Sequence, residues 1–272
     1  MSNSVSIATR VFLRVCLVGA GLLTLTPVTL KSSVVFDWPS SPGWTAGSPG
    51  AGQTLTQSFT SVNPNDITVA VNNSGAGVQG MNFVSSYPQI SATPVTGGLG
   101  GVNGLQLYAS SSQSFGTYIR TTITFDTPVI NLSFQIWDVD SVAGQFVDKI
   151  SNIQAIGSGG ITVGPDLVTS AVAGYNTISG TGLSTVVLGT ANANNSTNQG
   201  TINVTFNGPI TQFSFDWSNN DPALGQQAIA LGPLTYTPVP EDNAACTSLI
   251  LCLTAILFER LRRSRRLGFV VA

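Results

Sequence analysis

The residues of this chain best suited to chemistry are four aspartates in its second half. Asp138 and Asp140 lie two positions apart, so on a regular strand their side chains share a face. Asp148 follows a turn at Gly144, and Asp221 lies further along the chain. Calcium takes about six to eight oxygen ligands and needs neither His nor Cys. The pattern predicts a calcium site built from these four aspartates; the alternative is that they cap loop ends in Asx turns.

The same acids raise a second possibility, hydrolysis of a polysaccharide. Glycosidases use two carboxyl groups roughly 5 to 10 Å apart, and the candidates are Asp138, Asp140, Asp216 and Asp221. However, residues 34–238 contain no Glu, and the whole chain contains no His. The usual zinc sites and all imidazole-dependent catalysis are therefore excluded. We predict a protein that is not an enzyme, with a surface carbohydrate-active hydrolase using paired aspartates as the alternative.

Tryptophans are the third candidate for a binding role. Trp38 and Trp44 lie in a loop rich in Pro and Gly, and their ring faces can stack on sugar rings. We predict a possible carbohydrate contact there; the alternative is a loop that covers the end of the fold. Trp137 and Trp217 lie beside apolar strand residues, and we expect them to be packed inside.

Charge and cysteine usage both indicate an exported protein. Residues 34–238 hold nine Asp against Arg120 and Lys149, a net charge of −7. Such an acidic body repels nucleic acid, so nucleic acid is excluded as a partner. The three cysteines (Cys16, Cys246 and Cys252) all lie in apolar segments near the ends of the chain. The region between them therefore folds without disulfide bonds.

The region 34–238 is predicted to be an all-β domain. It is rich in Thr, Val and Ile, which favour strands, and in Gly, Asn and Pro, which favour turns. No helical periodicity longer than two turns occurs there. The alternation of apolar residues predicts ten strands: Thr54–Thr60, Ile67–Val71, Gly104–Ala109, Tyr118–Phe125, Leu132–Trp137, Ile150–Ile156, Thr185–Gly189, Thr201–Phe206, Gln212–Trp217 and Ala228–Tyr236. This number of closely spaced strands is typical of a single β-sandwich or jelly roll.

One sequence pattern occurs twice in this region. Ile123–Phe134 and Val204–Phe215 share Thr-Phe, then Pro, then Ser-Phe in the same order, and an Asp and a Trp follow each copy. The order predicts a strand, a Pro-containing turn and a second strand. The two copies are either equivalent hairpins in two facing sheets or two independent uses of a good hairpin.

The first 33 residues have the plan of a secretory signal peptide. Arg10 and Arg14 precede the apolar stretch Val15–Leu25, which Pro27 ends. A basic start, a short apolar centre and a polar exit are the features of such signals. We predict that residues 1–33 form a signal peptide; an uncleaved signal anchor is the alternative.

The opposite end carries a short apolar run followed by arginines. Ala244–Phe258 would form a helix of roughly 22 Å, whereas a bilayer core is about 30 Å thick. The arginines that follow stay on the cytoplasmic side and so stop translocation; they are Arg260, Arg262, Arg263, Arg265 and Arg266. The run is marginal for a permanent membrane helix but adequate for a temporary hold.

Residues 239–272 resemble the PEP-CTERM sorting signal of bacterial exosortase substrates. Val239, Pro240 and Glu241 match the motif of that family, while Asp242 stands where the motif usually has a second proline. The resemblance implies an exosortase-type processing enzyme as a partner. It also implies a transient anchor in the inner membrane and then release to the cell surface or extracellular matrix. An ordinary C-terminal membrane anchor is the alternative.

The repeated pattern also resembles the β-sandwich domains of bacterial surface proteins that carry interchangeable C-terminal anchors. Those domains often read Phe-x-x-Pro-Val, Ser-Phe and Asp-x-Asp, as do Phe125–Val129, Ser133–Phe134 and Asp138–Asp140 here. The resemblance implies a fold and a location. We therefore predict an exported surface or exopolysaccharide-associated protein with a structural or adhesive role, which binds calcium, extracellular polysaccharide or both.

Overall fold

The computed structural model describes residues 32–60, 65–75, 81–84, 86–110, 116–223 and 225–239. Nearly all of the predicted signal peptide and sorting signal, including Pro240, Glu241 and the five arginines, lies outside these ranges. Within them, no helix is long and apolar enough to cross a membrane. The only helical turns described are two short 3-10 segments, η1 (Ser158–Gly160) and η2 (Gly182–Ser184). The prediction of an all-β domain is confirmed for the described part of the chain.

The described strands are β1 (Val34–Phe36), β2 (Thr54–Phe59), β3 (Ile67–Asn73), β4 (Asn82–Phe83), β5 (Gln89–Ser91), β6 (Gly104–Ser110), β7 (Ile119–Trp137), β8 (Ser141–Val142), β9 (Phe146–Gly157), β10 (Thr162–Val163), β11 (Leu167–Ser170), β12 (Asn176–Ser179), β13 (Val186–Gly189), β14 (Ile202–Phe206), β15 (Ile210–Asn219) and β16 (Gln226–Pro238). The ten predicted strands all coincide with strands in this set. The strands that sequence reasoning missed are two to four residues long, too short for an alternating pattern to be visible.

The strands form two antiparallel layers. One layer has the order β2-β3-β7-β15-β9-β13-β12, and the other has β11-β14-β7-β16-β6, with β1 beside β16. Side chains from the two layers meet between them: Phe134 stacks on Phe213 with ring centroids 4.5 Å apart, and Phe125 meets Tyr236 at 5.2 Å. The fold is therefore a sandwich with one main core.

Strand β7 belongs to both layers. Its first half pairs with β3 and β15, and its second half pairs with β14 and β16. Along the strand, buried side chains occupy odd-numbered positions up to Val129 and even-numbered positions from Leu132 to Ile136; Trp137, at the end of the strand, is also buried. Asn131, at φ +53°, lies at this change of phase. The pairing of β7 with β16 shifts register here, which is a β-bulge. A β-bulge bends a strand and turns its side chains, so β7 keeps its apolar face inward as it passes between the layers.

The two similar segments are partners in the sheets. Val204 is paired with Phe134, and Phe213 with Ile123, so the copies run antiparallel beside each other. The prediction of a hairpin is wrong for the first copy, because Pro128 lies inside β7 rather than in a turn. In the second copy, β14 ends at Phe206 and β15 begins at Ile210, so Pro209 lies in the connection between two separate strands. Each copy crosses from one layer to the other at its Pro-containing position.

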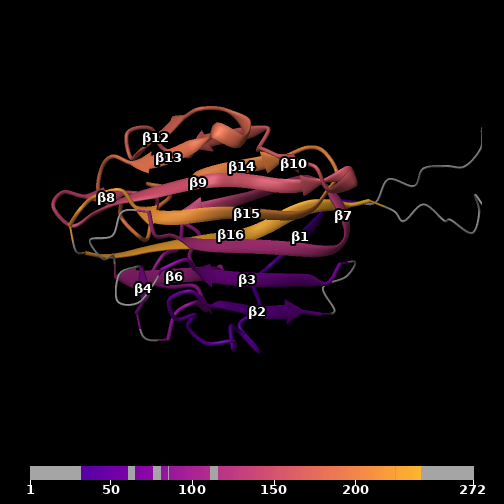
Figure 1. Ribbon diagram of the computed structural model, residues 1–272, viewed down its shortest axis with the longest axis horizontal. Helices are drawn as coiled ribbons and strands as arrows, with labels where there is room; N and C mark the ends of the chain where they lie inside the picture. The colour runs from indigo at the N-terminus through magenta and orange to yellow at the C-terminus, as the bar shows by residue number, and fades with distance from the viewer. Residues whose placement is uncertain are drawn as a thin grey trace, which may run out of the picture. The chain divides into compact units, whose positions relative to one another are not determined.

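The two ends of the sandwich are distinct. Figure 1 shows the β8 turn at one end and the β10 hairpin at the opposite end. Strand β9 runs between them from Phe146 to Gly157. At about 3.3 Å per residue these two residues are roughly 36 Å apart. A hollow lies at each end.

Candidate ligand-binding site

The hollow at the β8 end has a volume of about 320 Å³ and is lined mainly by polar side chains. Its lining comes from β6, β8, β9, β16 and three loops: Pro94, Tyr108, Asp138, Asp140, Val142, Phe146, Asn192, Asn195, Gln226, Gln227 and Ala228. Two of the four predicted calcium ligands are in this set. Neither Lys nor Arg is among the described lining residues, so the two acids have no basic neighbour in the wall.

Asp138 lies directly after β7 in a strained backbone conformation. Its φ is +67°, a region that residues other than Gly rarely adopt and that is enriched at functional sites. The neighbouring Val139 N–H donates to the Gly200 carbonyl at 2.9 Å. A Cβ on Gly200 would lie 3.2 Å from the Asp138 Cα, so the two loops fit closely. This contact fixes Asp138 at the wall of the hollow, where it is 6% exposed.

Asp140 is held by the loop on its other side. Its Oδ2 accepts a hydrogen bond from the Ala193 N–H at 2.7 Å, and the residue is 3% exposed. Its own backbone N–H donates to Asp148 Oδ2 at 3.2 Å. A carboxylate has about four lone-pair positions, so Asp140 retains acceptor capacity toward the hollow.

Asp148 has a different role from its two neighbours. It is fully buried and does not line the hollow. Its Oδ1 accepts from Trp217 Nε1–H at 2.7 Å, and its Oδ2 accepts from the Asp140 N–H. Because both oxygens are bound to protein donors, Asp148 acts as the support that positions Asp140.

Burial changes the ionisation of all three aspartates. Burial, and then the charge of Asp140, raise the pKa of Asp138 to about 8. Burial raises the pKa of Asp140 to about 6, although its hydrogen bonds act in the opposite direction. Burial and the neighbouring carboxylates also hold the pKa of Asp148 well above its usual range. The ionised forms of these groups therefore require a compensating positive charge or a proton.

Two residues that line the hollow each have a buried side-chain oxygen with no hydrogen-bond partner within the described part of the chain. The oxygens are Asp138 Oδ1 and Gln227 Oε1. Gln227 lies on β16, is 2% exposed, and directs its Nε2 toward Met81 Sδ at 3.7 Å. Both oxygens are closed off from solvent, so a ligand in the hollow does not reach them in this arrangement.

The rim adds neutral polar groups. Asn192 and Asn195 are exposed on the loop after β13. The Asn195 carbonyl accepts from the Thr96 N–H at 2.8 Å, which joins this loop to the segment that carries Pro94. Tyr108 donates its hydroxyl to Gln226 Oε1 at 2.5 Å. Amide and hydroxyl groups beside an aromatic residue are typical of sites that bind a polar ligand.

Asp221, the fourth predicted calcium ligand, does not line the hollow. Its Oδ1 accepts from the Ala223 N–H at 2.7 Å in its own turn, as the Asx-turn alternative expects. No group of three or more His, Cys, Asp or Glu within the described ranges is arranged to hold a metal ion. Of the four predicted ligands, Asp138 and Asp140 line the hollow, and Asp148 and Asp221 do not. Calcium binding itself stays a prediction.

The predicted sugar contact at Trp38 is wrong. This side chain is 2% exposed, packs edge-on against Phe36 and Phe59, and donates its Nε1–H to the Gly232 carbonyl at 2.8 Å. Trp44 is half-buried against the core, and its Nε1–H donates to the Gly47 carbonyl at 2.7 Å. The loop therefore covers the sandwich, which was the alternative.

The internal positions expected for Trp137 and Trp217 are confirmed, since both are fully buried. Asp216, one of the acids considered for hydrolysis, forms an ion pair with Arg120. Asp216 is also outside the set of residues that line the hollow. The acids considered for paired catalysis are thus divided among three different environments.

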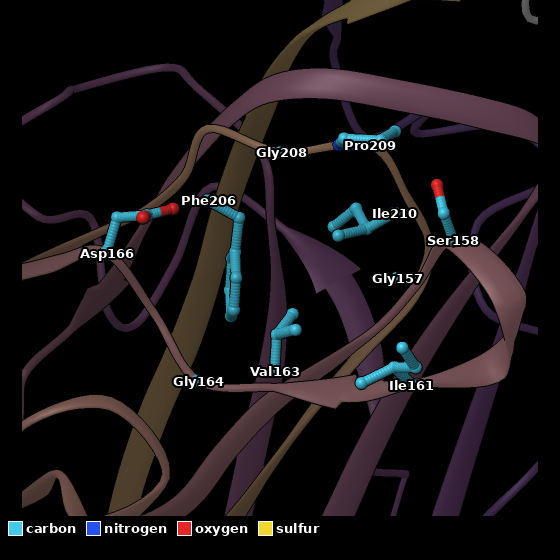
Figure 2. A pocket seen from close by; sticks show the side chains of 10 residues that line it. All are labelled: Gly157, Ser158, Ile161, Val163, Gly164, Asp166, Phe206, Gly208, Pro209 and Ile210. Carbon is cyan, nitrogen blue, oxygen red and sulfur yellow. The ribbon is translucent and has the colours of Figure 1, made fainter.

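The hollow at the β10 end is different in character (Figure 2). It has a volume of about 280 Å³ and lies between the β9–β10 turn and the β14–β15 turn. Val163, Phe206 and Ile210 form its apolar wall. The Asp166 carboxylate accepts from the Asn207 N–H at 2.6 Å. Because the β8-end hollow is lined by more polar side chains than this one, we assign the ligand site to the β8 end.

Sequence reasoning did not find the neutral half of the site. Gln227, Asn192 and Asn195 come from two elements separated by about 30 positions, in a chain where Asn and Gln are common. A single amide residue carries no pattern by itself. The conformation of Asp138 was equally invisible, because a positive φ at Asp depends on the loop that packs against it.

Comparisons with known proteins give the chain no family. No family model and no curated protein matches the sequence. Among solved structures, the N-terminal domain of the Streptococcus gordonii adhesin Sgo0707 matches with a TM-score of 0.38 and 10% identity, over 78% of this chain and 49% of that one. The mannan-recognising carbohydrate-binding module TmCBM27 matches with a TM-score of 0.33 and 12% identity, over 62% of this chain and 88% of that one. We draw nothing about function from either likeness.

Proposed function

We propose that this protein is an exported surface protein whose β-sandwich binds carbohydrate without altering it, as an adhesive or matrix component. The single observation that supports this most is the hollow at the β8 end, where acids, amides and a tyrosine come together in one wall. A sugar presents several hydroxyl groups close together, so one sugar can form hydrogen bonds with several such side chains at once. The hollow is also large enough for a single sugar unit or the end of a chain.

The rim supports the same ligand class. Exposed Asn192 and Asn195 can donate and accept hydrogen bonds, as hydroxyl recognition requires. Tyr108 lines the same hollow. A mixture of acidic, amide and tyrosine side chains suits a neutral polyol better than an anionic polymer, which the ionised Asp140 would repel.

Hydrolysis is the weaker candidate. A glycosidase needs two carboxyl groups on opposite sides of the scissile bond. Asp138 and Asp140 are separated by one residue and lie on the same short segment. Asp216 is bound by Arg120, and Asp221 by its own turn. The raised pKa of Asp138 suits a general acid, but a second carboxylate across the hollow is not among the described lining residues.

Export remains an inference from the sequence. A signal peptide over 1–33 and a PEP-CTERM-like segment over 239–272 would bring the domain to the cell surface or the exopolysaccharide layer. The acidic, disulfide-free body is compatible with that location. Exosortase-type processing and a transient membrane stage are part of the proposal.

A glycan array with the purified full chain tests the binding function. The double variant Asn192→Ala/Asn195→Ala removes two exposed rim amides and leaves the core intact. Asn198→Ala, an exposed Asn on the same loop that does not line the hollow, is the matched control. We expect the double variant to lose at least about tenfold in affinity, which corresponds to about 1.4 kcal/mol, and the control to bind normally. A wild-type chain that binds no glycan, or equal binding by the double variant, overturns the proposal.

A further inference from the structure

The β10 end of the sandwich exposes a group of large apolar side chains. Within the described ranges, six large apolar side chains are exposed. Four of them belong to β10, β11, η2 or the residue before β10: Ile161, Val163, Leu167 and Leu183. We call these four residues the β10-end apolar surface. Ile161, Leu167 and Leu183 are each more than half exposed.

The four side chains lie on neighbouring segments. Ile161 and Val163 line the hollow shown in Figure 2. The backbone at Gly164 lies so close to Leu183 that a Cβ on Gly164 would overlap it. Leu167 begins β11, three positions after Gly164. A contiguous apolar surface of this kind, with a hollow beside it, is typical of an interaction site.

The described part of the chain ends beside this surface. On β16, Pro238 is paired with Val129 of β7, and Val129 is also paired with Ile210, which lines the hollow. At a strand spacing of about 4.8 Å, Pro238 lies roughly 10 Å from Ile210. The apolar run Ala244–Phe258 begins six positions after Pro238, and six residues can span roughly 20 Å. The run can therefore reach the β10-end apolar surface.

The charge at this end complements the charge that follows the apolar run. Asp166 lines the hollow, and Asp126 donates its N–H to the Asp66 carbonyl where β3 begins. All three aspartates are exposed. The only bases in the described ranges, Arg120 and Lys149, lie toward the β8 end. Such an end repels anionic lipid and attracts the five arginines after the run.

We propose that residues 240–272 fold back on the same chain whenever the apolar run is outside a membrane. The run Ala244–Phe258 covers the β10-end apolar surface, and the arginines lie beside the aspartates. Apolar groups leave water on both sides of this contact, which favours it. The domain thereby shields its own sorting segment. This inference does not rest on glycan binding, because the hollow assigned to sugar is at the opposite end.

Disulfide cross-linking of the purified full chain, without detergent, tests this contact. The described ranges contain no Cys, whereas the apolar run contains Cys246 and Cys252. Cys16→Ser in every variant removes the remaining thiol. In Ile161→Cys under mild oxidation, we expect a disulfide within one chain between the introduced thiol and a thiol of the run, identified by peptide mass spectrometry. Leu183→Cys should behave in the same way, and both positions are exposed enough to tolerate the change.

Val35→Cys is the matched control. Val35 is also more than half exposed, and its pairing with Thr235 places it nearer to the end of β16 than Ile161 is. A tail that is free in solution would therefore cross-link to Val35→Cys at least as fast. A docked tail should cross-link at least about tenfold faster to Ile161→Cys, because docking raises the effective concentration of the thiols there. Replacing the five arginines with Gln should reduce this difference. Equal or faster reaction of Val35→Cys overturns the proposal.

Other occupants of the surface give different results. Disulfides that form only between two chains would assign the surface to a second copy and overturn the proposal. A dye on Ile161→Cys whose emission shifts on phosphatidylcholine vesicles, in a chain that forms no disulfide without them, would assign the surface to a membrane and also overturn it. A chain that cross-links as expected but binds no glycan upholds this inference and overturns the proposed function.

Discussion

The guanidinium of Arg120 and the carboxylate of Asp216 form a two-point ion pair between adjacent strands β7 and β15. Arg120 Nε lies 2.6 Å from Asp216 Oδ1, and Nη2 lies 2.8 Å from Oδ2. Asp216 is 1% exposed and accepts a further hydrogen bond from Asn152 Nδ2 at 2.7 Å. The pair joins residues 96 positions apart in sequence, and it assigns this aspartate to the fold rather than to a binding site.

Arg120→Met should lower the free energy of unfolding by about 3 kcal/mol, because it leaves a buried carboxylate without its cation. This is the low end of the range for buried pairs, since the Arg120 side chain is 34% exposed. The double variant Arg120→Met/Asp216→Leu should recover most of the loss. Denaturant midpoints measured by tryptophan fluorescence check both values; equal stability of the wild type and Arg120→Met would contradict this account.

Gly189→Ala should destabilise the domain by about 3 kcal/mol and disturb the hollow. A Cβ at this position would lie 1.8 Å from the Asp140 carbonyl oxygen, so the backbone next to that acid must move. The matched control is Gly208→Ala, where no described atom lies within 4 Å of the added Cβ. Its stability should change by no more than about 0.5 kcal/mol. Thermal unfolding of both variants distinguishes a steric effect from a general effect of Gly replacement.

Tyr236 should make stability fall at alkaline pH. Burial raises its pKa to about 12, whereas the unfolded chain has its usual value near 10. Between these values the unfolded chain loses a proton that the folded chain keeps, so stability decreases as pH rises, by about 1.4 kcal/mol at pH 11. Tyr236→Phe should remove this component of the pH dependence.

The same variant should be at least as stable as the wild type at pH 7. The Tyr236 hydroxyl is buried and has no hydrogen-bond partner among the described residues, so its removal relieves an unsatisfied group. Unfolding curves at pH 7 and pH 11 provide the test. An equal decrease in stability for both proteins would show that other groups dominate.

Trp38→Phe should destabilise the domain by about 2 kcal/mol through lost packing and an unsatisfied Gly232 carbonyl. Because Trp38 is inside the core, glycan binding by the folded variant should be unchanged. Trp44→Phe, at the half-buried position, should lower stability by less than about 1 kcal/mol. A loss of glycan affinity in Trp38→Phe without unfolding would restore this residue to a binding role.

Most of the long strands could be predicted from the sequence, because the alternation of apolar and polar residues is a local pattern. Segments such as Ile67–Val71 and Gln212–Trp217 alternate apolar and polar residues over enough positions to identify a strand. The continuity of β7 was not accessible in the same way. Pro128 normally suggests a turn, and only pairing with β14, β15 and β16 shows that the chain continues through it.

Of the candidate site, only the acidic residues could be predicted from the sequence. The spacing of Asp138 and Asp140 identified two acids that reach the same hollow. Asp148 has the same side chain and lies nearby in sequence, yet Trp217 binds its carboxylate in the core. The difference depends on a residue 69 positions away, which no local pattern contains.

Strand β16 has an orientation that matters for a tethered protein. It begins at Gln226 and Gln227, in the wall of the hollow, and ends at Pro238, just before the last described residue. At about 3.3 Å per residue, its two ends are separated by roughly 35 to 40 Å. A chain held through residues beyond Val239 would therefore present the hollow on its distal side, pointing away from the tether and toward whatever surrounds the cell.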